Sequence, residues 1–169
     1  MPMSEYVRRV RDAIGTELLL VPSVAVLLRD DDARLLLVRH ADHGQWGLLG
    51  GAIDPDESPR HAAARESREE IGVEVVVGDV VGALGGRAYE VEYANGDRTA
   101  YVTIVYDGRV AGGELRPDGI EVTEIGWFHD AELDGADLHF FARAALVDLG
   151  LIEGLAGPVA PGDAATSPR

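Results

Sequence analysis

The sequence predicts an α+β or α/β sandwich built around a mixed β-sheet. Apolar, β-branched runs recur along the whole chain, and two substantial amphipathic segments separate them. Hydrophobic residues make up 46% of the 169 residues, which is enough for one ordinary domain to bury a core. We therefore expect a single folded domain in which helices cover a sheet of several strands.

The first part of the chain begins with a short helix and two strands. Ser4 to Ile14 is predicted to be helical because its apolar residues recur at helical spacing. Leu18 to Arg29 is predicted to be a strand whose start is kinked or lies at a sheet edge, since Pro22 cannot donate a backbone hydrogen bond. Leu35 to Val38 follows a turn of three aspartates, so the two strands are predicted to form a hairpin.

The second part continues with a mixture of helices and strands. The predicted elements are a helix from Ser58, strands at Val73 to Leu84, Tyr89 to Tyr93, Thr99 to Val110 and Glu121 to Phe128, and a helix at Leu138 to Leu149. The pair Asn95-Gly96 is a strong hairpin signal, and it lies between the second and third of these strands.

Three segments differ in composition. We expect a helix in residues 1–16, one domain in residues 17–152, and a disordered tail in residues 153–169, where Gly, Pro and Ala dominate and little can be buried. No stretch reaches the 18 apolar residues of a membrane span, and the polar start does not resemble a secretory signal. These features predict a cytoplasmic protein without a membrane partner.

The charge is strongly acidic. Thirty Asp and Glu residues face 15 basic residues, all of them Arg, and the formal net charge is −15. This balance argues against a nucleic-acid polymer as partner, because neutralising a phosphate backbone needs basic clusters. The absence of Cys excludes disulfides, thiolate zinc sites and Cys nucleophiles.

One predicted helix carries a cluster of acids. Ser58 is a favourable N-cap, and Gly72 can end the helix in a left-handed conformation. Between them Glu66, Glu69 and Glu70 are spaced i, i+3 and i+4, so they share one face. Like charges at this spacing repel by a few tenths of a kcal/mol per pair, roughly. A hard cation such as Mg²⁺, which prefers oxygen ligands, would turn the repulsion into a binding site.

The alternative is an acidic helix face that is simply solvated. Two features favour the cation site. Gly50 and Gly51 precede the helix by a short loop and allow backbone groups to approach an ion or phosphate closely. Arg65 lies between that loop and the acids, where it can pair with Glu57 and fix the loop on the helix.

The spacing of these residues resembles the signature of the Nudix hydrolase family. Gly51, Glu57, the Arg65-Glu66 pair, the Glu69-Glu70 pair and Gly72-Val73 occupy every fixed position of that pattern. Two neighbouring residues depart from it. Ser67 stands where the family usually has an aliphatic residue, and we expect its hydroxyl to bond the Ala63 carbonyl. Leu49 stands where a Pro commonly precedes the paired glycines, which leaves the loop geometry less constrained.

The resemblance implies a fold, an activity and a cofactor. Family members hydrolyse a pyrophosphate bond in a nucleoside diphosphate linked to another group, share an α/β/α sandwich with a mixed central sheet, and usually require Mg²⁺ or Mn²⁺. A bound metal lowers the pKa of water for attack at phosphorus. Many relatives dimerise, so a homodimer is favoured.

Roles for individual residues follow from the same resemblance. Glu66, Glu69 and Glu70 would be metal ligands, and one of them or a later carboxylate would be the general base. The further candidate ligands are the Gly50 or Gly51 carbonyl and the side chains of Glu121 and Glu124. Glu57 and Arg65 would hold the loop against the helix. The candidate phosphate contacts are Arg39, Arg87 and Arg98, and the candidate base-stacking residues are Trp46 and Tyr89, although each of these five has a purely structural alternative.

The substrate is less constrained. The chain has no Pro between Pro59 and Pro117, which disfavours the ADP-ribose type, and Tyr89 resembles a marker of the dinucleoside-polyphosphate type. Nucleoside triphosphates and dinucleoside polyphosphates are therefore favoured over ADP-ribose, with nucleotide sugars as a further alternative. A nucleotide-binding regulatory module without catalysis and a purely structural acidic domain are the alternatives from other classes.

Overall fold

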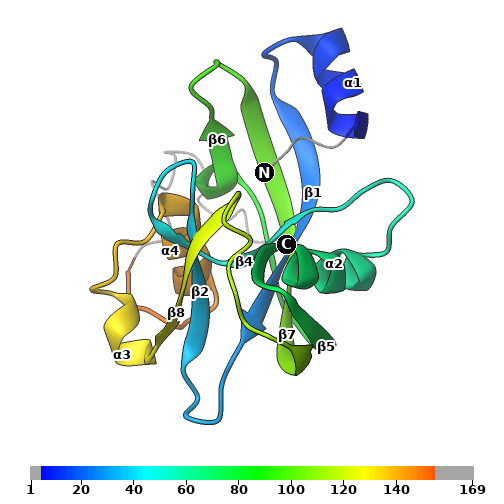
Figure 1. Cartoon of the computed structure of the whole chain (residues 1–169). Helices are drawn as coiled ribbons and strands as arrows, with labels where there is room; N and C mark the ends of the chain where they lie inside the picture. Colours follow the sequence, from blue (N-terminus) through cyan, green and yellow to red (C-terminus); the bar gives the residue numbers. More distant parts are fainter. Residues whose placement is uncertain (1–4, 155–169) are drawn as a thin grey trace, which may run out of the picture.

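A computed structural model describes residues 5–154 (Figure 1). The first residue of the predicted N-terminal helix, Ser4, and residues 155–169 of the predicted tail lie outside the described residues. No helix in the described part of the chain is long and apolar enough to cross a membrane.

The structure contains the mixture of helices and strands that the sequence predicts. In chain order the elements are α1 Glu5–Ile14, β1 Leu19–Leu28, β2 Leu35–His40, β3 Trp46–Gly47, β4 Leu49–Ala52, α2 Pro59–Ile71, β5 Val73–Leu84, a 3₁₀ helix Arg87–Tyr89, β6 Glu90–Glu92, β7 Arg98–Gly113, β8 Val122–Phe128, α3 Asp130–Leu133 and α4 Phe140–Asp148. The predicted strand at Tyr89 is thus shorter than expected, and Tyr89 itself ends the 3₁₀ helix.

The strands form two sheets. The larger has the order β4-β1-β7-β5, with β6 also paired to β7, and the smaller has the order β3-β2-β8. Because β1 runs parallel to β7 but antiparallel to β4, the larger sheet is mixed, as predicted. Pro22 lies just before the stretch where β4 joins β1, so the start of β1 has a partner on one side only, again as predicted.

The predicted hairpin between β1 and β2 is wrong. The two strands belong to different sheets and share only an isolated bridge between Arg29 and Leu35. The physical reason is that β1 already pairs with β4 on one side and with β7 on the other, which leaves no free edge for β2. The turn itself forms, with the Asp30 side chain accepting the backbone N–H of Arg34.

The helices α2 and α4 lie on opposite sides of the strands, which gives an α/β/α sandwich (Figure 1). One core cluster lies between the strands and α2, and the other between the strands and α4. Strand β2 serves both cores, because Leu35 and Leu37 face the α4 side while Leu36 and Val38 face the α2 side. This double burial explains the continuous apolar run in its sequence.

The N-terminal helix α1 is held by a buried arginine. Arg11 is the only buried residue of α1, and its guanidinium donates to the backbone carbonyls of Glu17 and Arg98 and to the Thr99 hydroxyl. Polar contacts therefore fasten α1 to the start of β7, whereas the sequence suggested an apolar stripe.

Candidate active site

The loop that precedes α2 begins in β4, a strand that requires glycine at position 50. In β4, Gly50 pairs with Ala25 of β1 and has a φ of 146°. A Cβ at this position would lie 2.1 Å from the Val24 carbonyl oxygen, so any other residue would push the two strands apart. The Gly50 N–H instead donates to Glu70 Oε2 over 3.3 Å, which brings the loop backbone to the acids of α2.

Helix α2 begins and ends at the predicted residues. The Ser58 side chain accepts the His61 N–H, Pro59 is the first helical residue, and Gly72 ends the helix with a φ of 73°. Ser67 is fully buried, and its hydroxyl donates to the Ala63 carbonyl over 2.8 Å, as predicted from the sequence. These contacts fix the position of α2, and with it the direction in which its glutamates point.

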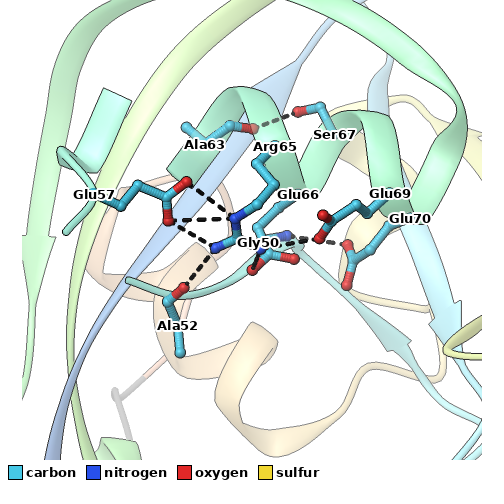
Figure 2. Close-up of polar contacts among 9 residues, drawn as sticks. All are labelled: Gly50, Ala52, Glu57, Ala63, Arg65, Glu66, Ser67, Glu69 and Glu70. Carbon is cyan, nitrogen blue, oxygen red and sulfur yellow. Dashed lines mark hydrogen bonds and ion pairs between the residues drawn. The ribbon is translucent and has the colours of Figure 1, made fainter. Parts of the chain in front are cut away.

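Arg65 connects four parts of the site (Figure 2). Its Nε lies 3.0 Å from Glu57 Oε1, which confirms the predicted pair. One terminal nitrogen donates to the Ala52 carbonyl over 3.0 Å, and the other donates to Glu66 Oε1 over 2.8 Å and Glu69 Oε2 over 3.0 Å. Arg65 therefore holds the loop on the helix and also orients two of the three clustered glutamates.

Burial separates the three glutamates. The residues Glu66 and Glu70 are only 4% and 2% exposed, whereas the Glu69 side chain is 58% exposed. The alternative of a solvated acidic face is therefore wrong for two of the three residues. Glu70 Oε1 is buried and finds no hydrogen-bond partner among residues 5–154. Such an orphaned acceptor is costly, and a cation would satisfy it.

The same burial changes the ionisation of both acids. Desolvation raises the pKa of Glu66 to about 7, against the opposing effect of the Arg65 charge. It raises the pKa of Glu70 well above the ordinary value, and the neighbouring Glu66 charge adds to the increase. Two adjacent carboxylates that resist ionisation are typical of a functional site, because a bound cation removes the penalty.

The donor set fits a hard cation by its chemistry. Carboxylates and backbone carbonyls are the ligands that Mg²⁺ prefers, and one carboxylate oxygen, Glu70 Oε1, is buried without a hydrogen-bond partner among the described residues. Among residues 5–154, however, no three His, Asp or Glu side chains converge at metal-binding spacing. Arg65 holds the Glu66 and Glu69 carboxylates while Glu70 turns to Gly50, so cation binding would require some of these side chains to rotate.

Glu121 and Glu124, the two candidate metal ligands outside α2, have different surroundings in the structure. The Asp118 N–H donates to the Glu70 carbonyl and the Asp118 side chain accepts the Glu121 N–H, so the backbone of Glu121 lies close to the end of α2. After burial, the charge of Glu121 also contributes to the raised pKa values of Glu66 and Glu70. Glu124 instead faces Arg39 across β2 and β8, with 3.0 Å between Arg39 Nε and Glu124 Oε2. Glu124 is thus engaged by a cation of the protein, and Glu121 is the better placed of the two.

The proposed substrate contacts do not come together. The Arg39 guanidinium lies over the Trp46 ring at 4.6 Å, and Trp46 also packs edge-on against Phe128. Trp46 is 7% exposed, so protein groups occupy both Arg39 and Trp46.

Tyr89, Arg87 and Arg98 lie away from the carboxylates. Tyr89 is 1% exposed and its hydroxyl donates to Asp148, the last residue of α4, which argues against a stacking role for its ring. Arg87 begins the 3₁₀ helix that Tyr89 ends, and this helix lies on the opposite side of the strands from α2. Arg98 is the first residue of β7, and Val105 of the same strand pairs with Ala25, which in turn pairs with Gly50. The seven residues from Arg98 to Val105 span roughly 20 Å along the strand, so Arg98 lies far from the loop that precedes α2.

In the loop of residues 114–121, between β7 and β8, sequence reasoning identified Glu121 as a candidate ligand but missed how the loop is attached to the site. Its backbone bonds to the end of α2 through Asp118, whose N–H donates to the Glu70 carbonyl over 3.1 Å. The signal was present in Pro117-Asp118-Gly119, because Pro, Asp and Gly in this order favour a tight turn in which the Asp side chain accepts backbone N–H groups. The Ala52 carbonyl, which accepts from Arg65, had no sequence signal.

Known proteins resemble this chain over most of its length. Residues 19–149 match the family model described as the NUDIX domain. A MutT-like protein of Streptomyces ambofaciens is 33% identical over 128 residues, which cover 76% of this chain and 75% of the relative. A CTP pyrophosphohydrolase of Escherichia coli is 42% identical over 65 residues, covering 37% of this chain and 48% of the relative.

Two further comparisons cover nearly the whole of the matching protein. The nucleoside triphosphatase NudI of Salmonella agona is 29% identical over 133 residues, or 74% of this chain and 94% of the relative. The crystal structure of a MutT protein from Methanosarcina mazei Go1 superimposes with a TM-score of 0.60 at 30% identity, covering 75% of this chain and 94% of that one. The match therefore extends across both sheets and α2.

Proposed function

The chain belongs to the Nudix hydrolase family and is a hydrolase acting on phosphoric anhydrides, and we propose that it cleaves the pyrophosphate bond of a nucleoside triphosphate with the aid of Mg²⁺. One observation carries the proposal. Glu66 and Glu70 are buried next to each other, and Glu70 Oε1 lacks a hydrogen-bond partner among the described residues. A fold without use for a cation would gain stability by replacing these acids with apolar residues.

The carboxylates of Glu66, Glu69 and Glu70, the Gly50 or Gly51 carbonyl and the Glu121 carboxylate are the proposed ligands of Mg²⁺, with Mn²⁺ as the alternative ion. When bound, such an ion neutralises phosphate oxygens and lowers the pKa of a coordinated water.

The protein's own groups orient the acids and accept a proton. Arg65 bonds Glu57, Glu66 and Glu69, so it keeps these carboxylates close to one another, and the acids of α2 rotate from these bonds when they bind a cation. We assign the general base to one of the buried carboxylates. Burial raises the pKa of Glu66 to about 7 and that of Glu70 well above its ordinary value, and a raised pKa suits a group that must take a proton from water.

The names of two relatives support the substrate class. One acts on CTP and the other is a nucleoside triphosphatase, and the second is matched over 94% of its length. Dinucleoside polyphosphates share the triphosphate-like chain and are the second substrate class to test, followed by ADP-ribose and nucleotide sugars. The expectations of a homodimer, of a cytoplasmic location and of no nucleic-acid polymer as partner stay predictions.

A substrate screen tests the proposal. Purified protein is incubated with Mg²⁺ and nucleoside triphosphates, dinucleoside polyphosphates, ADP-ribose or nucleotide sugars, and the products are separated and identified. We expect a nucleoside monophosphate and pyrophosphate from a triphosphate. Glu70→Gln should abolish this turnover, while Glu74→Gln, an exposed acid outside α2, should not.

The screen also distinguishes the alternatives. Turnover that survives in Glu70→Gln would contradict the assignment of the site. Calorimetric nucleotide binding without hydrolysis of any substrate would favour the regulatory module. If neither nucleotide nor Mg²⁺ raises the melting temperature, the protein is a structural acidic domain, since specific binding must stabilise the native state.

A further inference from the structure

Residues 114–121 form a loop, here called the strap, that is fastened to the C-terminal end of α2. The Arg116 N–H donates to the Ile71 carbonyl over 3.1 Å, and the Asp118 N–H donates to the Glu70 carbonyl over 3.1 Å. Carbonyls in the last turn of a helix have no partner within the helix, so the strap satisfies two of them. The strap is thereby bonded to the backbone of Glu70, one of the two buried acids of the site.

The side chain of Asp118 folds the strap. Its Oδ1 accepts the N–H groups of Ile120, Glu121 and Val122 over 3.1, 3.1 and 2.9 Å. Three amides directed at one carboxylate oxygen form a tight turn immediately before β8. Asp118 therefore links the end of α2, through its N–H, to the turn that carries Glu121, through its side chain.

Glu121 is held between the strap and the loop after β2. Its carbonyl accepts the Ala41 N–H over 2.8 Å, and the residue lines a hollow together with His40, Ala41, Asp42 and Ile120. The bonds of Asp118 to the Glu70 carbonyl and to the Glu121 N–H hold the Glu121 backbone at the end of α2 that carries Glu70. After burial, the charge of the Glu121 carboxylate also adds to the raised pKa values of Glu66 and Glu70. The position of this carboxylate thus depends on the turn that Asp118 forms.

We propose that Asp118 is a positioning residue: it holds the Glu121 carboxylate beside the acids of α2 and so strengthens the binding of a divalent cation there. Asp118 need not touch the ion or the substrate, because it acts through the strap. The inference rests on the proposed function for its effect on hydrolysis, but its effect on cation binding can be measured without any substrate.

The chain contains a matched control for this residue. In the turn between β1 and β2, at the bottom of Figure 1, Asp30 Oδ1 accepts the N–H groups of Asp32 and Arg34 over 3.1 and 2.9 Å. Asp30 therefore stabilises a turn by the same chemistry, far along β1 from the site. Asp30→Ala should lower the melting temperature without changing the affinity for a cation.

The main experiment measures the rise in melting temperature of the full chain as Mg²⁺ alone is added, and separately the Mg²⁺ concentration that gives half-maximal hydrolysis. We expect Asp118→Ala to raise both midpoints by about 10-fold, the range found when groups that orient metal ligands are removed. Asp118→Asn keeps a carbonyl oxygen for the three amides, so it should raise them by about 3-fold or less. Midpoints for Asp118→Ala within 2-fold of the wild type, or an equal shift in Asp30→Ala, would overturn the proposal.

A double-mutant cycle tests whether Asp118 acts through Glu121. If it does, Asp118→Ala combined with Glu121→Gln should be no worse than the more severe single variant. If the double variant raises the Mg²⁺ midpoint by the product of the two single changes, Asp118 does not act through Glu121. A Glu121→Gln variant that binds Mg²⁺ normally would overturn the same claim. Should Asp118→Ala not fold, Asp118→Asn replaces it in the cycle.

The two proposals fail in different ways. Wild-type protein that is stabilised by Mg²⁺ but hydrolyses no nucleotide would contradict the proposed function, and the cation midpoints would still decide the role of Asp118. If the wild type shows no stabilisation by Mg²⁺, the inference about Asp118 is wrong.

Discussion

The two helices that cover the strands, α2 and α4, bury different kinds of side chain. Helix α4 buries Ala142, Ala144, Ala145 and Leu146, all of them apolar. Helix α2 also buries apolar residues against its core, but it adds Glu66, Ser67 and Glu70. One helix is therefore specified by packing alone, whereas the other carries buried acids that oppose folding in the absence of a cation.

This difference indicates that α4 serves mainly the stability of the fold and α2 mainly its function. Burying an ionised carboxylate costs several kcal/mol, roughly, unless it is paired or bound to a cation. In α2 the cost is reduced by Arg65 at Glu66 and by the Gly50 N–H at Glu70, but Glu70 Oε1 is left without a partner in the described part of the chain. Substitutions in α2 should therefore affect turnover, and substitutions in α4 should affect stability.

After the loss of turnover expected for Glu70→Gln, the next largest effect is expected at Glu69. Because its side chain is 58% exposed, Glu69→Gln should leave the fold intact while removing a proposed ligand. We expect kcat to fall by about 1,000-fold, or about 4 kcal/mol in the activation free energy. Steady-state kinetics and a thermal melt check this prediction. A variant with near-normal kcat would show that the acids of α2 are not equivalent in function.

The corresponding change in α4 should act on stability. Leu146 is fully buried, and Leu146→Ala should lower the free energy of unfolding by about 3 kcal/mol, within the usual range for a leucine cavity. Denaturant unfolding measures the loss. The activity per folded molecule should stay close to wild type. A large fall in kcat, measured where the variant is folded, would contradict the separation between the two helices.

The acids of α2 should make the metal-free protein less stable as the pH rises. The folded-state pKa of Glu66, about 7, lies above its ordinary value of 4.5, so folding favours the protonated form. This contribution is fully present below about pH 4.5 and is lost as the pH rises through 7, which amounts to on the order of 3 kcal/mol. Glu70 changes stability in the same direction.

Melting temperatures at pH 6 and pH 8 in a metal-free buffer test this pH dependence. The decrease should be smaller in Glu66→Gln, which cannot ionise, and should persist in Glu74→Gln, which removes the same charge from an exposed position. Mg²⁺ should raise the melting temperature most at pH 8. Identical pH profiles for the two variants would show that the general acid excess, and not Glu66, causes the decrease.

The smallest effect is expected at Ser67. Its hydroxyl donates to the Ala63 carbonyl, which already accepts a backbone hydrogen bond of the same helix, so the extra bond adds little stability. Ser67→Ala should raise the free energy of unfolding by a few tenths of a kcal/mol, roughly, because Ala is the better helix former. A thermal melt checks the sign. A marked loss of stability would show that this hydroxyl matters more to the packing of α2 than its single bond indicates.

Local signals in the sequence predicted the site well where they were strong. Ser58, Pro59 and Gly72 fixed the ends of α2, and the spacing of Arg65 to Glu57 predicted their ion pair, because helix ends and nearby charge pairs depend on few residues. The hairpin of β1 and β2 could not be rejected in the same way. Its failure depends on β4 and β7 occupying both edges of β1, and β7 lies about 80 residues further along the chain.

The sequence by itself determined the mixed fold class, the family signature and the helix on which three glutamates are spaced for a cation. Only the tertiary structure decided which glutamates are buried, that the loop carrying Glu121 is bonded to the end of α2 while Glu124 pairs with Arg39, and that Tyr89 belongs to the core. The physical reason is that helical periodicity places a side chain on a face, whereas its burial and its partners depend on segments distant in sequence. The strap illustrates both, since Pro117-Asp118-Gly119 predicts a turn but not the helix end to which that turn is bonded.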